Sequence, residues 1–133
     1  MGVSQGVPVP TEAVLNQMAD AVIYADRGGK IALWNRAAAA LFGYEAAEAL
    51  GSSIDIIVPE RLREPHWRGF EAAMASGTLR LSGRPTLTRA LHKDGSRLYI
   101  EMSFALVKNA DGSAVGSVAV ARVAAPPRPA ERQ

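Results

Sequence analysis

The chain has 133 residues, 48% of them hydrophobic, and a formal net charge of +2, which suits one globular domain that buries its own core. It contains no cysteine, and this excludes disulfides, thiolate metal sites, thioether-linked haem and a thiol nucleophile. Only three of the fifteen basic residues are lysines and the arginines are scattered, so nucleic acid is not expected as a partner.

The first part of the chain predicts a leader, a short helix and a hairpin. Residues 1–10 contain two prolines, two glycines and no apolar period, which indicates a flexible leader rather than a signal peptide. Thr11 is a suitable N-cap for a helix that reaches about residue 18. Two β-rich runs then flank the turn at residues 26–29. No window approaches a membrane span, so we expect a cytoplasmic protein without a membrane partner.

Strong helix formers fill the next segment. Gly43 and Gly51 are placed to end two successive short helices, and Pro59 can start a further helical turn. Pro65 lacks an amide donor, so it is predicted at the first position of a helix that ends at Gly77. Five residues of this helix follow the i, i+3, i+4, i+7, i+8 rule and share one face: His66, Gly69, Phe70, Ala73 and Met74. His66 is therefore predicted to point inward.

The last part of the chain predicts three strands over residues 78–92, 97–108 and 113–124, joined by turns that each contain an Asp-Gly pair. Period-two alternation in the middle strand places one apolar set on the core face: Leu98, Ile100, Met102, Phe104 and Leu106. Residues 125–133 form a polar, proline-rich tail or linker. The order of elements predicts an α+β domain with short helices on one face of a five-stranded antiparallel sheet, enclosing a cavity.

Two long stretches carry a family resemblance. Residues 18–66, "MADAVIYADRGGKIALWNRAAAALFGYEAAEALGSSIDIIVPERLREPH", and the later "HKDGSRLYIEMSFALV" resemble a PAS sensor domain. The resemblance covers residues 11–124 and rests on the Asp-Gly-type turn, the Trp34-Asn35 step and the Lys93-Asp94-Gly95 hairpin. It implies a PAS fold that binds a small ligand or dimerises and passes on a signal, although unrelated ligands share this scaffold.

A more specific resemblance concerns the helix that contains His66. The segment "VPERLREPHWRGFEAAMASG" resembles the helix of FixL-type and Dos-type oxygen sensors, in which the matching histidine is the proximal ligand of b-type haem. Gly83 and Arg84 match the distal side, where an arginine hydrogen-bonds the gas ligand in the FixL type. The resemblance thus implies non-covalent haem b at His66, a diatomic gas ligand (O2, with CO or NO as others), a homodimer and an attached or separate output domain.

The residues can be judged on their own chemistry. Haem iron takes a neutral imidazole in an apolar slot, and the face of His66 and Phe70 supplies one. Gly69 leaves room for a flat porphyrin, and Met102 offers a soft thioether that could pack beside the haem or act as a second axial ligand. Leu79, Ile100 and Phe104 would wall the gas pocket. Strict alternation along residues 79–91 groups Leu79, Leu81, Leu87 and Leu91 and turns Arg84 to the other face, unless a bulge intervenes at Gly83 or Pro85.

Plainer interpretations remain open. A histidine on an apolar face is often a core residue, Arg84 can be an ordinary exposed strand residue, and His92 beside a turn is expected at the surface. Trp34, Phe42 and Met74 are expected to pack in the core. No Ser-His-acid set, phosphate loop or facial triad is present, so no enzyme activity is expected. The competing function is a haem-free PAS module for dimerisation, protein interaction or another small ligand.

Overall fold

The computed structural model describes residues 6–79 and 83–125, so residues 1–5 of the predicted leader, Leu81, and residues 126–133 of the predicted tail lie outside the described residues. Within these ranges no helix is both long enough and apolar enough to cross a bilayer. The elements follow one another as α1 (Thr11–Gln17), β1 (Ala21–Asp26), β2 (Ile31–Trp34), α2 (Arg36–Phe42), α3 (Ala46–Ala49), the 3-10 helices η1 (Ile54–Ile57) and η2 (Glu60–Leu62), α4 (Arg63–Ser76), β3 (Thr86–Leu91), β4 (Arg97–Lys108) and β5 (Ala114–Val123).

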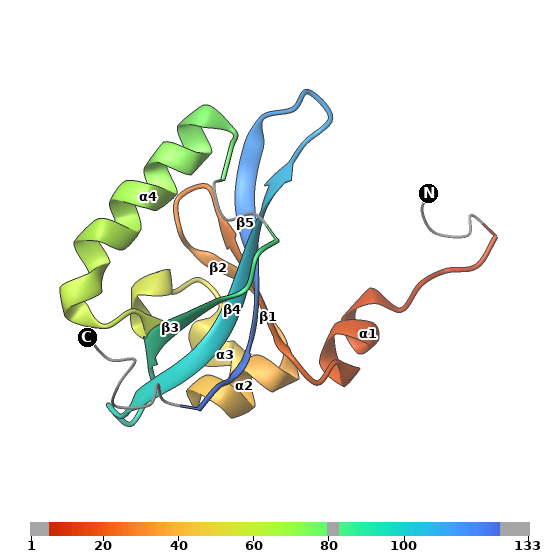
Figure 1. Ribbon diagram of the computed structural model, residues 1–133. Coiled ribbons are helices and arrows are strands. Elements are labelled where there is room, and N and C mark those ends of the chain that lie inside the picture. The colour runs from red at the N-terminus through yellow and green to blue at the C-terminus, as the bar shows by residue number, and fades with distance from the viewer. Residues whose placement is uncertain (1–5, 80–82, 126–133) are drawn as a thin grey trace.

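The five strands form one antiparallel sheet in the order β2-β1-β5-β4-β3, which confirms the predicted sheet. The hairpin of β1 and β2 is extended by the last strand of the chain. Strand β5 pairs with β1 along its whole length, with Ile23 opposite Ala119. The strands nearest the two ends of the chain therefore lie side by side in the middle of the sheet (Figure 1).

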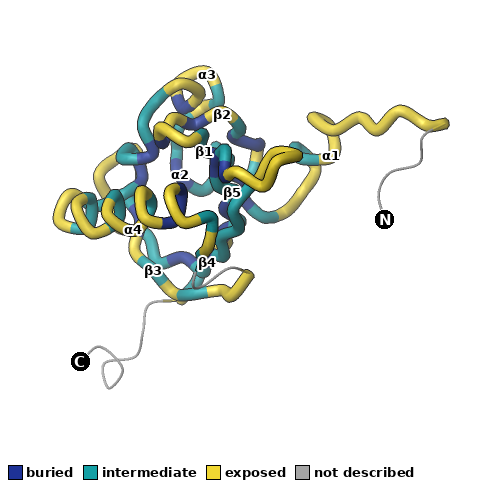
Figure 2. Tube along the Cα trace, turned by 90° about the horizontal axis from the view of Figure 1, so that it is seen from above, coloured by how far each residue is buried: buried dark blue, intermediate teal, exposed yellow. Residues whose placement is uncertain are grey.

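The core lies between the sheet and the helices α2, α3 and α4, which cover one of its faces, whereas α1 lies on the other side (Figure 1). Buried segments cluster where these elements meet, and the outer surfaces of α1 and α4 are exposed (Figure 2). Trp34 and Phe42 are buried with their ring centroids 5.6 Å apart, and Met74 is buried on α4, so all three predicted packing roles are confirmed.

Asn35 joins three elements through its side-chain amide. Its Oδ1 accepts hydrogen bonds from the backbone N–H groups of Val22 in β1 (2.9 Å) and Ala38 in α2 (3.0 Å). Its Nδ2 donates to the carbonyls of Leu15 in α1 (2.7 Å) and Asp20 (3.1 Å). The side chain uses its full hydrogen-bonding capacity and is buried, so it fixes α1 and α2 relative to the sheet.

Glycines end the helices where the sequence predicts. Gly43 follows α2 and Gly77 follows α4, both in the left-handed conformation that a residue without Cβ adopts at little cost. Helix α4 starts at Arg63, so Pro65 is its third residue and not its first. The difference costs no hydrogen bond, because the first N–H groups of a helix have no partner within it.

The strand predicted over residues 78–92 is wrong in its extent and its inward face. Strand β3 starts only at Thr86, and its inward positions are Thr86, Thr88 and Ala90, of which Ala90 is buried. Leu87 points outward and is 62% exposed, so it does not join a core face with Leu79. The physical reason is that the residues immediately before Thr86 lie in a loop, where successive side chains do not have to alternate between two faces.

Gly116 offers a sharp test of the pairing between β1 and β5. A Cβ at this position would collide with the backbone oxygen of Ala25 and the Tyr24 ring. We expect Gly116→Ala to lower the free energy of unfolding by about 1–3 kcal/mol, because the two strands must separate. Gly69→Ala is the matched control, since its Cβ would meet open space and alanine favours a helix by about 1 kcal/mol. Urea unfolding followed by circular dichroism measures both, and equal effects would contradict this packing.

Candidate functional site

His66 lies in an aromatic cluster on α4. Its ring is 5.2 Å from that of Trp67, edge to face at 77°, and 6.1 Å from that of Phe70, nearly parallel at 27°. Its Nδ1 atom is buried and, among the residues that the structure describes, has no hydrogen-bond partner. His66 as a whole is half-buried, and one enclosed ring nitrogen is left without the partner that a buried core histidine normally has.

Burial also sets the charge of His66. Desolvation lowers the pKa of the imidazole below its ordinary value, and the nearby Asp55 carboxylate opposes this shift to a smaller extent. The neutral ring is therefore favoured at neutral pH. A neutral imidazole has one nitrogen that donates and one with a free lone pair, which is the form that ligates a metal.

The other apolar residues predicted for the site lie on two elements. Phe70 is half-buried on α4, and Leu79 is half-buried just after this helix. Ile100 and Met102 are buried on the inner face of β4, where Phe104 packs against the same core. The helix and the strand thus supply an imidazole and an apolar wall on the same side of the sheet, although Gly69 is exposed and its missing Cβ gives room only to solvent.

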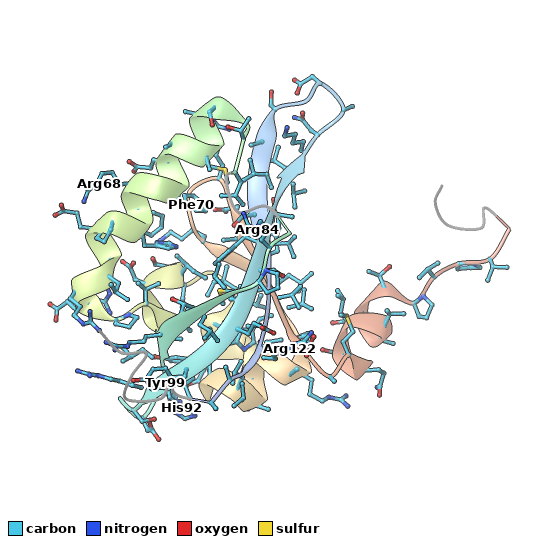
Figure 3. The ribbon with its side chains drawn as sticks, viewed as in Figure 1. Arg68, Phe70, Arg84, His92, Tyr99 and Arg122 are labelled. Atoms are coloured by element: carbon cyan, nitrogen blue, oxygen red, sulfur yellow. The ribbon has the colours of Figure 1, made fainter. Side chains whose placement is uncertain are left out.

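Arg84 occupies a different setting from the strand position that the sequence suggested. It lies in the loop that leads into β3, between Gly83 and Pro85, and it is exposed (Figure 3). Gly83 has a positive φ of 73°, and its N–H donates to the carbonyl of Phe104 at 2.8 Å. Arg84 is therefore not in a strand, because the chain turns at Gly83. The hydrogen bond from Gly83 holds the loop against β4 at Phe104, one of the residues predicted to line the gas pocket.

His92, the second histidine of the chain, has a structural role. Its ring lies against Gly43, so a Cβ there would collide with it, and its side chain is 26% exposed rather than fully at the surface. Its Nδ1 accepts a hydrogen bond from the backbone N–H of Asp94 at 3.1 Å. The next residue, Lys93, donates its N–H to the Phe42 carbonyl, so the turn between β3 and β4 is fastened to α2.

Trp67 is a site residue that sequence reasoning missed. Its indole Nε1 donates to Asp55 Oδ1 at 2.7 Å, and its ring packs on Gly29 in the turn between β1 and β2. The available signal was its spacing of three residues to Phe70, which places the two aromatic rings on adjacent positions of one helix face. Its contacts with Gly29 and Asp55 join residues that are far apart in the sequence, so no local sequence pattern predicts them.

Known proteins match this chain along most of its length. The family model described as "PAS fold" matches residues 11–124. The oxygen sensor protein DosP of Escherichia coli is 29% identical over 94 residues, which are 71% of this chain and 12% of DosP. The sensor protein FixL of Bradyrhizobium diazoefficiens is 28% identical over 91 residues, which are 68% of this chain and 18% of FixL.

A solved structure shows the same fold. The PAS domain of a protein from Colwellia psychrerythraea superposes with a TM-score of 0.70 at 24% identity, covering 84% of this chain and 92% of that one. The present chain spans less than a fifth of the length of the two sensor proteins that it matches, so it corresponds to one module of each. The family match, the strand order and the positions of the helices together show that this chain belongs to the PAS family.

Proposed function

We propose that this PAS domain holds b-type haem through His66 and senses a diatomic gas, O2 in the first place and CO or NO as further ligands, without catalysis of its own. The observation that carries the proposal is the buried Nδ1 atom of His66, which lacks a hydrogen-bond partner on a ring that burial keeps neutral. Such a nitrogen is costly to bury in an ordinary core, and this favours a functional role of the ring over a purely structural one.

The surrounding residues fit the group. Within the described part of the chain, no group of three His, Asp or Glu side chains could bind a metal ion directly. Haem iron needs only one ligand from the protein, because the porphyrin supplies the others. Phe70 lies nearly parallel to His66, and Ile100 and Phe104 would supply apolar surface on the β4 side of the group. When bound, haem b supplies an iron whose open axial position takes a diatomic gas.

The relatives support the same direction. DosP is named an oxygen sensor and FixL a sensor protein, and both align with about two thirds or more of this chain. At 28–29% identity these names add weight to the gas-sensing proposal for the domain as a whole. Both relatives are several times longer than this chain, so we also propose that an output domain, attached or separate, receives the signal.

Two residues would tune the distal side. Met102 is buried on β4 and carries a soft thioether that can pack near the haem or act as a second axial ligand when gas is absent. Arg84 is exposed and follows Gly83, whose N–H is bonded to the Phe104 carbonyl, so we propose that its side chain moves toward Phe104 when gas binds. There it would donate charge-assisted hydrogen bonds to the gas ligand and shift the loop before β3.

A haem-free dimerising or ligand-binding module is the second candidate, and the surface of α1 favours it. Val14 lies in the middle of α1 and is 50% exposed, and Met18 follows the last residue of the helix and is 39% exposed. Beside this helix lies an open groove of about 570 Å³ whose apolar lining includes Leu15, Leu33 and Leu50. A homodimer that covers this surface is compatible with haem binding as well, and light scattering with and without hemin tests it separately.

The test of the main proposal is an absorption titration with hemin. We expect the parent protein to give a red-shifted Soret band that saturates at one hemin per chain. His66→Ala should lose this band, whereas His92→Ala should keep it, because His92 packs on Gly43 away from the aromatic cluster. A parent spectrum identical to that of free hemin would contradict haem binding and leave the second candidate.

A further inference from the structure

We propose that Trp67 is the positioning residue that sets the direction of the His66 ring, by clamping α4 to η1 and to the turn between β1 and β2. The inference rests on the proposed function in one respect, namely that His66 is the haem ligand. The clamp itself consists of contacts among residues of this chain.

The first half of the clamp is a hydrogen bond. Trp67 Nε1 donates to Asp55 Oδ1 at 2.7 Å, a bond strengthened by the negative charge of the acceptor. The acceptor is itself held in place, because the backbone N–H of Asp55 donates to Ser53 Oγ (3.1 Å) and its carbonyl accepts from Val58 (3.1 Å). The position of the indole is thus fixed by a residue whose backbone cannot easily move.

The second half of the clamp is a close packing contact. Gly29 is buried with a φ of 80°, and any Cβ there would overlap the six-membered ring of Trp67. The carbonyl of Gly29 accepts a hydrogen bond from the N–H of Ile54 (3.0 Å), so the turn and η1 are joined to each other as well. Trp67 also packs against the main core, to which its neighbour Phe70 does not belong. It therefore anchors the first half of α4.

The clamp matters for His66 because of what that ring lacks. A metal-ligating histidine is usually oriented by a hydrogen bond from its other ring nitrogen, which fixes the tautomer and the ring plane. With Nε2 as the ligating nitrogen, the other nitrogen of His66 is Nδ1, and Nδ1 has no such bond among the described residues. Its ring is held instead by the edge-to-face contact with Trp67 and the stacked contact with Phe70, and Trp67 packs edge to face on Phe70 at 5.4 Å. Orientation by packing replaces orientation by a bond.

The experiment first uses the haem-free protein. The chain has two tryptophans, and Trp34 Nε1 donates to the Tyr44 carbonyl at 2.8 Å, so its indole N–H resonance is an internal reference. Asp55→Ala keeps every aromatic ring. We expect it to shift the Trp67 indole resonance and the ring-current-sensitive Cε1–Hε1 resonance of His66, while Trp34 and His92 stay in place. Asp55→Asn, which still accepts from the indole, should restore both signals.

The second readout is hemin loading of the same three proteins. Asp55→Ala should weaken hemin binding by about 10- to 100-fold, the range that follows loss of an outer-shell partner, and should broaden the iron–histidine stretching band in resonance Raman spectra. Asp55→Asn should stay within about 3-fold of the parent. Unchanged affinity and an unchanged band would overturn the positioning role while leaving haem binding intact.

The two proposals fail in different ways. If the parent binds no hemin, the proposed function fails, and the haem-free spectra still judge the clamp. A His66 resonance that stays fixed when the Trp67 resonance moves would overturn the clamp on its own, because the direction of the His66 ring would then not depend on Trp67.

Discussion

A His66→Gly variant is expected to lose hemin affinity by at least about 100-fold and to regain a histidine-type Soret band when free imidazole is added. The loss should exceed that for an outer-shell residue because the variant removes the axial ligand itself. The rescue separates ligation from packing. Glycine leaves a cavity next to Phe70 that an imidazole molecule can enter. A ligand role predicts that the band returns at imidazole concentrations too low to ligate free hemin.

The control for this rescue is a variant that disturbs the cluster without removing the ligand. Phe70→Leu keeps His66 but removes the stacked contact, so hemin affinity should fall by about 10-fold, with no rescue by imidazole. A titration followed at the Soret maximum measures all three proteins. Failure of imidazole to restore the His66→Gly band, in a variant that is still folded by circular dichroism, would show that His66 packs rather than ligates.

The largest effect on stability is expected from Asn35→Leu. Leucine has a similar volume but removes the side-chain partner of the Val22 and Ala38 N–H groups and of the Asp20 carbonyl. The Leu15 carbonyl also loses this donor and keeps only the N–H of Met18 at 3.4 Å. A buried unsatisfied group costs about 1–3 kcal/mol, so the free energy of unfolding should fall by about 3 kcal/mol or more. The exposed face of α1 should then fray first, since Asn35 is one of its attachments to the sheet.

Asn16→Ala is the matched control for this variant. Asn16 Oδ1 accepts one exposed hydrogen bond from the backbone N–H of Arg36 at 3.0 Å, so its loss should cost about 0.5–1 kcal/mol. Urea unfolding monitored by circular dichroism gives both values. Equal losses for Asn35→Leu and Asn16→Ala would mean that the buried amide does not hold α1 and α2 to the sheet.

Short sequence patterns predicted the turns between strands and the ends of helices. The Asp-Gly turns before Ser96 and Ser113 lie between paired strands, and the glycines at 43 and 77 end their helices. The pairing of β1 with β5 could not be derived from periodicity, since it joins segments about a hundred residues apart. The sequence patterns therefore predict five antiparallel strands but not that β1 and β5 are neighbours.

In the candidate site too, residues on regular elements could be predicted, whereas residues that depend on loops or tertiary contacts could not. His66 and Phe70 could be predicted because a helix repeats every 3.6 residues, and Ile100 and Met102 because a strand alternates. Arg84 could not, since a glycine with positive φ precedes it and alternation does not survive a turn. Trp67 was missed for another reason. Its partners Gly29 and Asp55 lie in a turn and a 3-10 helix, where side-chain direction depends on tertiary contacts.

The most direct test of the gas-sensing account is the absorption spectrum of the hemin-loaded, ferrous protein, recorded under argon, then under oxygen, and again under argon. We expect the Soret band to move on adding oxygen and to return when oxygen is removed, in the parent and in His92→Ala but not in His66→Ala. A ferrous spectrum that does not respond to oxygen, CO or NO would contradict it.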